Sequence, residues 1–188
     1  QGTYTNARGT AYFDSENWSG TNIVNVDGTE LRFGFGALMH VKSITTDRDM
    51  HIEAGTVLDV VSGNVTAAPG TATQNFWIQN AGVLTSSSGT LTFDFQTPFS
   101  TAGAEDQSVR VLIEDYDGFT PLQVVKNGPG GVNNFDQLNT YSGGTIINAG
   151  RISVANVNAL GSGTVTVNSG GQAFLSLAAA TYVNPITI

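Results

Sequence analysis

The last third of the chain most strongly constrains the fold, because it consists of short apolar runs separated by small polar turns. The runs are too short for helices, and they carry β-branched residues at every second position, as β-strands do. The turns are rich in Gly, Asn and Ser and recur with similar chemistry. The runs are 144–147, 151–154, 164–167 and 172–175. This pattern predicts parallel strands wound into coils, with one strand per face in each coil.

A local turn pattern recurs along the chain: a polar or acidic residue, a small residue, Gly, and a new apolar run. Its glycines are 27, 68 and 20 positions apart, and the longest spacing equals about three coils of a β-helix. Gly and Asn both tolerate the left-handed conformation that a corner requires, and stacked Asn corners can bond to one another. The predicted corner residues are Gly55, Gly82, Gly143, Gly144, Asn148, Gly150, Asn168 and Gly170.

The expected fold is a single all-β domain, a right-handed parallel β-helix (β-solenoid) with a less regular N-terminal β region. Right-handedness is expected because parallel crossovers strongly prefer it. We divide the chain into an irregular N-terminal capping region (1–60), middle coils with protruding loops (61–123) and repeat coils (124–188). Segments 65–74 and 98–107 are predicted loops, 115–121 is a predicted corner, and Asp27-Gly28 indicates a hairpin or a corner.

Charge and composition exclude several function classes. The net charge of −8 disfavours binding to nucleic acid and to anionic membranes. The chain has no cysteine, hence no disulfide or thiolate metal site, and no apolar run long enough for a transmembrane helix. Only 12% of residues are charged, about half the usual share, which is typical of extracellular β-rich proteins. Because the chain starts at Gln1 without a signal peptide, we interpret it as processed or excerpted.

Four motifs follow one another in the C-terminal third. They are Lys126-Asn127-Gly128-Pro129-Gly130, Asn139-Thr140-Tyr141-Ser142-Gly143-Gly144-Thr145, Asn148-Ala149-Gly150, and Ala159-Leu160-Gly161-Ser162-Gly163-Thr164-Val165-Thr166-Val167. In this order they resemble the passenger-associated transport repeat, also called the autotransporter-associated β-strand repeat. Near the start, Phe13-Asp14-Ser15-Glu16-Asn17-Trp18-Ser19-Gly20 is similar to the opening of many such exported proteins, with Phe13 where Trp is frequent.

The resemblance implies a secreted or surface-exposed bacterial β-helix. In autotransporters the repeat helps the passenger to fold and to leave the cell, and it also occurs in large surface proteins without a transport barrel. This chain lacks the C-terminal barrel, so the resemblance implies either a piece of a larger protein or another export route.

Candidate metal and catalytic residues are few. Asp47, Asp49 and the run Glu114-Asp115-Tyr116-Asp117-Gly118 could offer oxygen ligands to Ca²⁺, but solvated corner acids are the simpler interpretation. His40 and His51 could serve a Ser-His-Asp triad, yet no nucleophile-elbow motif is present and exposed strand positions are favoured. A glycosidase-like pair of carboxylates could come from Asp14, Glu16, Asp27 or Glu30. No cofactor, metal or catalytic residue is therefore predicted.

Aromatic and basic residues give no defined site. Aromatic residues could form a sugar-stacking surface, although core packing is the commoner role in a solenoid. The basic residues are scattered. The aromatic candidates are Trp18, Trp77, Tyr116, Phe119 and Tyr141, and the bases considered are Lys42, Arg48, Arg110, Lys126 and Arg151.

The expected function is that of an extracellular structural or adhesive protein of a bacterial surface, without enzymatic activity. Segment 185–188 is strand-like and has no polar cap, so the stack is expected to continue end to end, in a longer passenger or as a filament of repeated subunits. Its partners would be copies of itself or further coils, and surface glycans. The alternatives are a glycan-binding module and a polysaccharide-degrading β-helix enzyme.

Overall fold

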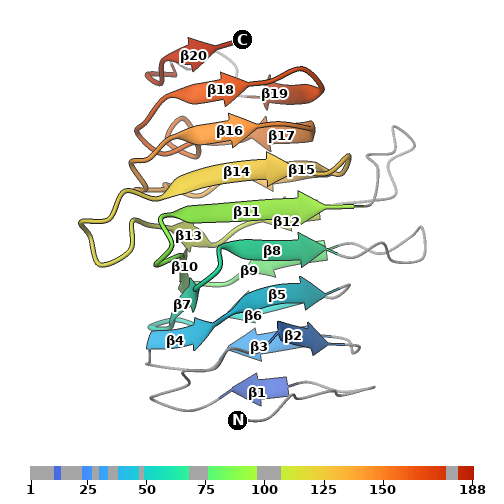
Figure 1. Ribbon diagram of the computed structural model, residues 1–188, viewed down its shortest axis with the longest axis vertical. Coiled ribbons are helices and arrows are strands. Elements are labelled where there is room, and N and C mark those ends of the chain that lie inside the picture. The colour runs from blue at the N-terminus through green and yellow to red at the C-terminus, as the bar shows by residue number, and fades with distance from the viewer. Residues whose placement is uncertain are drawn as a thin grey trace.

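The structure, a computed structural model, describes residues 11–13, 23–26, 30–33, 38–46, 49–67, 76–96, 107–176 and 182–188. These residues form only strands, turns and irregular segments, and none of them lies in a helix. The strands pile up along the long axis of the molecule, with the N-terminus at one end and the C-terminus at the other (Figure 1). The chain is therefore all-β, as the short alternating runs predict.

The strands form three parallel sheets, which we name A, B and C. Sheet A contains, in hydrogen-bonding order, β1 (Ala11–Phe13), β3 (Glu30–Phe33), β6 (Asp49–Ile52), β9 (Phe76–Gln79), β12 (Gln107–Val109), β15 (Gly131–Phe135), β17 (Gly150–Val154) and β19 (Gly171–Leu175). Sheet B contains β4 (Leu38–Val41), β7 (Val57–Val60), β10 (Val83–Thr85) and β13 (Leu112–Ile113). Sheet C contains β2 (Ile23–Val26), β5 (Ser43–Thr46), β8 (Asn64–Ala67), β11 (Thr90–Phe95), β14 (Gln123–Asn127), β16 (Thr145–Ile147), β18 (Val165–Val167) and β20 (Ile186–Thr187).

Consecutive strands along the chain lie in different sheets, and each strand pairs with the one that occupies its sheet in the next coil. In the upper coils Val124 pairs with Thr145, and Thr145 pairs with Val165, which are steps of 21 and 20 residues. In the middle coils the steps are longer, since Leu91 pairs with Val124, 33 residues away. The parallel stacking of three sheets is compatible with a β-helix.

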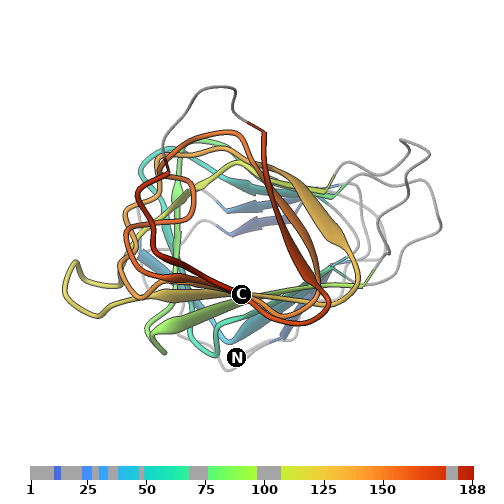
Figure 2. The ribbon, with the colours of Figure 1, turned by 90° about the horizontal axis from the view of Figure 1, so that it is seen from above.

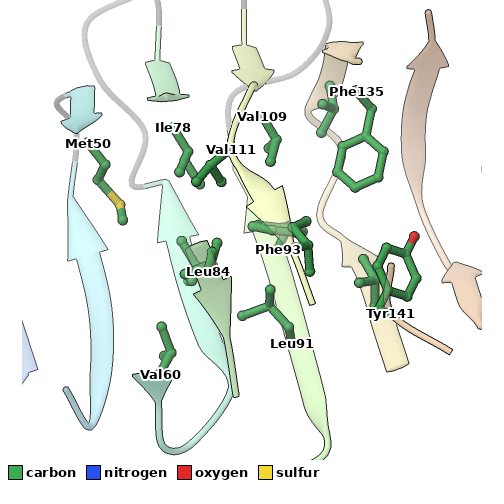
Figure 3. Close-up of a cluster of buried hydrophobic side chains, with 14 of the residues drawn as sticks. Met50, Val60, Ile78, Leu84, Leu91, Phe93, Val109, Val111, Phe135 and Tyr141 are labelled. Atoms are coloured by element: carbon green, nitrogen blue, oxygen red, sulfur yellow. The ribbon is translucent and has the colours of Figure 1, made fainter. Parts of the chain in front are cut away.

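The core lies between the sheets and is aliphatic and aromatic. In strands such as β6, β11 and β14 every second side chain is buried, and in β11 Leu91, Phe93 and Phe95 are at most 1% exposed. Met50, Ile78, Val109 and Phe135 from sheet A meet Val60 and Leu84 from sheet B and Phe93 from sheet C (Figure 3). Phe93 packs edge-on against both Phe95 and Phe135, with ring centroids 5.8 and 6.4 Å apart.

One local prediction is wrong, and one of two alternatives left open by another is excluded. Segment 65–67 is part of strand β8 and not of a loop, because Val65 and Ala67 fill buried positions between β5 and β11. The runs on either side of Asp27-Gly28 do not form a hairpin, because β2 and β3 belong to different sheets and pair in parallel with β5 and β6. Of the predicted loop 98–107, the last residue, Gln107, is instead the first residue of β12. Residues 27 and 28 themselves, residues 98–106 and most of the N-terminal region lie outside the described residues.

Candidate functional site

The predicted corner glycines lie at turns, but at two different corners. Gly55 and Gly82 follow β6 and β9 and lead from sheet A to sheet B. Gly150, the first residue of β17, and Gly170, directly before β19, instead lie where the chain passes from sheet C to sheet A. The prediction that these four glycines mark one corner, repeated after whole numbers of coils, is therefore wrong. The sequence misleads here because a turn that contains Gly has the same local residues at either corner. Gly143 and Gly144 precede β16, on the way into sheet C.

The asparagines form a hydrogen-bonded column on the outer corner of three successive coils. The side-chain amide of Asn148 donates to Asn127 Oδ1 at 2.9 Å, and that of Asn168 donates to Asn148 Oδ1 at 2.7 Å. These contacts are possible only when the coils are in register, since the three residues come from adjacent parallel strands at the same position. The column fixes the stacking of this part of the chain.

The other repeat motifs meet in a buried polar network. Asn139 accepts a hydrogen bond from the Ile113 N–H at 2.9 Å and donates to the Ala159 carbonyl at 2.7 Å, so its side chain bridges two coils beyond the last strand of sheet B. The Tyr141 hydroxyl lies 2.6 Å from Thr145 Oγ1, and Thr145 donates to the Leu160 carbonyl at 3.1 Å. Burial raises the pKa of Tyr141. These motif residues hold neighbouring coils together.

Lys126 is the most unusual side chain of the motifs, because it points into the protein and is fully buried. Its ammonium donates to the Asn127 carbonyl and, at 3.0 Å, to the Gly128 carbonyl, and it lies 5.6 Å from the centre of the Phe95 ring. Burial lowers the pKa of Lys126 to about 8, although the nearby Asp94 opposes the shift. The lysine thus closes the turn at 127–130 from inside.

Because the Lys126 ammonium is buried, we expect the folded chain to become more stable as the pH rises into the alkaline range. The Lys126 pKa is about 8 in the folded chain and ordinarily 10.5, so between these values the unfolded chain binds more protons and stability rises with pH. We expect the free energy of unfolding to increase through this group by about 2 kcal/mol between pH 7 and pH 9.5. Urea titrations at both pH values should show that Lys126→Met lacks this gain, while Lys42→Met, at an exposed lysine, keeps it. Equal pH dependence in both variants would contradict the burial of this charge.

Among the described residues, neither histidine lies in a Ser-His-Asp arrangement. His40 Nδ1 lies 2.8 Å from Asp59 Oδ2 on the neighbouring strand, and Asp59, fully buried, also accepts the Ser87 N–H at 2.7 Å. No described serine hydroxyl reaches the other ring nitrogen of His40. His51 instead contacts the side-chain amides of Gln79 and Asn80 at 3.2 and 3.3 Å. The His40–Asp59 pair therefore joins two strands of sheet B.

The acidic corner at 114–118 is held in shape by hydrogen bonds to two of its carboxylates. Asp115 accepts from the Leu122 N–H at 2.7 Å and from the N–H and hydroxyl of Ser142 at 2.8 and 2.7 Å. Burial raises the pKa of Asp115, but these hydrogen bonds outweigh it, and the pKa is lowered. Asp117 accepts from the Phe119 and Thr120 N–H groups, both at 3.0 Å. Among the described residues, no three His, Asp or Glu side chains gather to hold a metal.

The remaining candidates are dispersed. Asp49 accepts the Trp77 N–H at 2.9 Å, and the Arg110 guanidinium lies 5.4 Å from the Trp77 ring centre. The prediction that Tyr141 could stack on a sugar is wrong, because its side chain is fully buried. Phe119 is 89% exposed, on another face. Asp14, Glu16, Trp18, Asp27, Asp47, Arg48 and the side chain of Glu30 lie outside the described residues.

The apolar outer face of sheet B was not predicted from the sequence. Its strands carry aliphatic residues on both faces, as in the pairs Val57-Leu58 and Val83-Leu84, where the second residue is buried and the first is half-buried. Adjacent apolar residues in a short strand, in place of alternation, are the signal that could have indicated an apolar outer surface.

Comparison of the chain with protein-family models, with curated proteins and with solved structures gives no match. The resemblance to the passenger-associated transport repeat therefore rests on the motifs alone. Within the described residues there is also no helix long and apolar enough to span a bilayer.

Proposed function

We propose that this chain is a structural and adhesive component of a bacterial cell surface, a right-handed parallel β-helix that stacks end to end within a longer passenger or a filament. The motifs that resemble the passenger-associated transport repeat support this assignment, because they are the residues that join one coil to the next. In such a stack, stability is approximately a sum of interactions between neighbouring coils, so length can grow without a new core.

The observation that carries the proposal is a core that runs uncovered to the C-terminal end. Val124, Thr145, Val165 and Ile186 form one in-register column, of which the first three are fully buried and Ile186 is 46% exposed. The column of Phe135, Val154 and Leu175 ends in the same way, with Leu175 37% exposed. Apolar side chains at core positions favour a further layer on this end, from more coils or another copy.

The rival functions have less support. A polysaccharide-degrading enzyme needs two carboxylates that flank the bound sugar from opposite sides. Asp49, Asp59 and Asp115 instead accept hydrogen bonds from backbone N–H groups of neighbouring coils, and Glu114 and Asp117 both lie on one loop, residues 114–118. A glycan-binding module with a continuous aromatic platform is disfavoured by the dispersal of Trp77, Phe119 and Tyr141 described above. An extracellular location agrees with the absence of cysteine and the low content of charged residues.

Self-association through the uncovered end is the testable consequence. We expect the chain to form larger species with rising concentration in sedimentation velocity, and the double variant Leu175→Lys/Ile186→Lys to remain monomeric, because apposed lysines would have to be desolvated at the interface. Both side chains are exposed in the single chain, so the replacements should leave its own fold intact.

The matched control places the same charges on the sides of the stack. Val61 and Leu138 are 43% and 58% exposed, and Val61→Lys/Leu138→Lys should associate as the unmodified chain does. An unmodified chain that stays monodisperse and monomeric up to millimolar concentration would contradict end-to-end stacking. Equal loss of association in both double variants would instead indicate nonspecific aggregation.

A further inference from the structure

A groove lies on the outer face of sheet B, beside the loop that joins β13 to β14. That loop projects from the body of the molecule (Figures 1 and 2). The volume of the groove is about 330 Å³. Strands β4, β7 and β10 form its floor, and residues 114–118 form a wall. This surface lies on the side of the stack, apart from the C-terminal end that the proposed function uses.

The floor of the groove is an aliphatic row. Leu38, Val57 and Val83 are in-register partners on adjacent strands, so their outward side chains lie side by side across the sheet. Leu38 is 43% exposed, and the two valines are half-buried. A row of branched aliphatic groups on a solvent-facing strand surface offers contact area to apolar side chains.

The loop that forms the opposite wall is held in shape before any ligand arrives. Asp115 anchors it to Leu122 and Ser142, and Tyr116 and Thr120 form an antiparallel bridge across its tip. Asp117, with φ of 53°, fixes the turn through its bonds to Phe119 and Thr120. A wall fixed in this way loses little conformational entropy on binding.

The rim of the groove is acidic and has no compensating base. The side chains that line it include Glu114, Asp115 and Asp117 and no lysine or arginine. Asp115 is occupied by the bonds above, but no described residue bonds to the Glu114 carboxylate, and Asp117 uses only one oxygen. Two carboxylates are thus open to a ligand beside an apolar floor.

We propose that this groove binds an extended cationic amphipathic peptide segment, whose apolar side chains rest on the aliphatic row while its lysines or arginines pair with Glu114 and Asp117. The net charge of −8 attracts such a partner. A glycan fits less well, because sugar rings stack on aromatic faces, whereas the floor is branched aliphatic and Tyr116 is the single aromatic residue among those that line the groove. Alternate side chains of an extended peptide point to opposite faces, which suits a floor on one side and solvent on the other.

The test uses an acetylated eight-residue peptide of alternating lysine and leucine, with binding measured by calorimetry at about 0.1 M salt, near the ionic strength where exposed charges still interact. Peptides of alternating glutamate and leucine, and of lysine and serine, separate the charge from the apolar contribution. We expect only the lysine–leucine peptide to bind measurably.

Variants then locate the site. Glu114→Gln/Asp117→Asn keeps the shape and the turn-forming acceptor but removes both charges, and we expect about fivefold weaker binding. Val57→Thr/Val83→Thr keeps the β-branched shape of the floor but makes it polar, again with about fivefold weaker binding expected. The matched controls are Glu53→Gln/Asp136→Asn, with the same change in net charge on another face, and Val125→Thr, on the outer face of sheet C. Both should change the affinity by less than about twofold.

Each alternative outcome overturns the proposal. Equal weakening by the two charge variants would indicate general electrostatic attraction, and equal binding of the lysine–serine peptide would remove the aliphatic floor from the site. Binding of uncharged oligosaccharides that survives Glu114→Gln/Asp117→Asn would assign the groove to a glycan instead. None of these results depends on end-to-end stacking, which the sedimentation experiment tests separately.

Discussion

Replacing Tyr141 with alanine is expected to lower the free energy of unfolding by about 4 kcal/mol, as for other buried aromatic residues truncated in a core. Tyr141 is the largest fully buried side chain described. Its ring lies directly against Gly161 of the next coil, where a methyl group on that glycine would stand 2.6 Å from a ring carbon. Truncation would leave a cavity between two coils that the rigid strands on either side cannot close.

Two further variants separate the contribution of the Tyr141 hydroxyl from that of its ring, and the effect of burial from that of ring size. Tyr141→Phe keeps the ring and should cost about 1 kcal/mol, because Thr145 retains its bond to the Leu160 carbonyl when the hydroxyl partner is removed. Phe119→Ala removes a ring of similar size that is 89% exposed, and it should change the stability by less than about 0.5 kcal/mol. Chemical denaturation followed by circular dichroism measures all three. A Tyr141→Ala variant as stable as Phe119→Ala would show that this ring does not join the coils.

The parallel architecture was predictable because its signal is local. Strands of two to six residues, many with alternate burial, and turns of Gly and Asn follow directly from short-range sequence patterns. The contact between Asn148 and Asn168 also follows from them, since two identical corners in successive coils must meet when the strands are in register.

The features that could not be predicted depend on contacts between residues that are far apart in the sequence. Which corner a glycine occupies is set by how many strands precede it in the coil, and the long connections of the middle coils hide that count. Lys126 resembles a surface lysine in the sequence, and only the position of its β-carbon on the inner face of β14 directs it into the core. The groove escaped prediction because its floor and its wall come from four separate segments of the chain.

Replacing Gly150 with alanine should be similarly damaging, for a reason that concerns the backbone alone. Gly150 has φ of 70°, and a methyl group on it would lie 2.2 Å from the Gly130 carbonyl oxygen and 2.8 Å from that of Gly128. Both oxygens belong to the coil below, and the Gly128 carbonyl also accepts the bond from Lys126. Relief of the clash would require the two coils to separate, so we expect a loss of at least about 3 kcal/mol in the free energy of unfolding.

Gly118 provides the control that separates this clash from backbone strain. Its φ of 73° matches that of Gly150, but a methyl group there would meet nothing within 4 Å. Gly118→Ala therefore carries only the cost of an alanine in the left-handed region, about 1 kcal/mol. Urea denaturation of the two variants should differ by about 2 kcal/mol or more, which is the steric contribution of the coil below. If both variants lose the same stability, the coils do not approach each other at Gly150 as closely as the structure places them, and the stacking of this region would have to be looser.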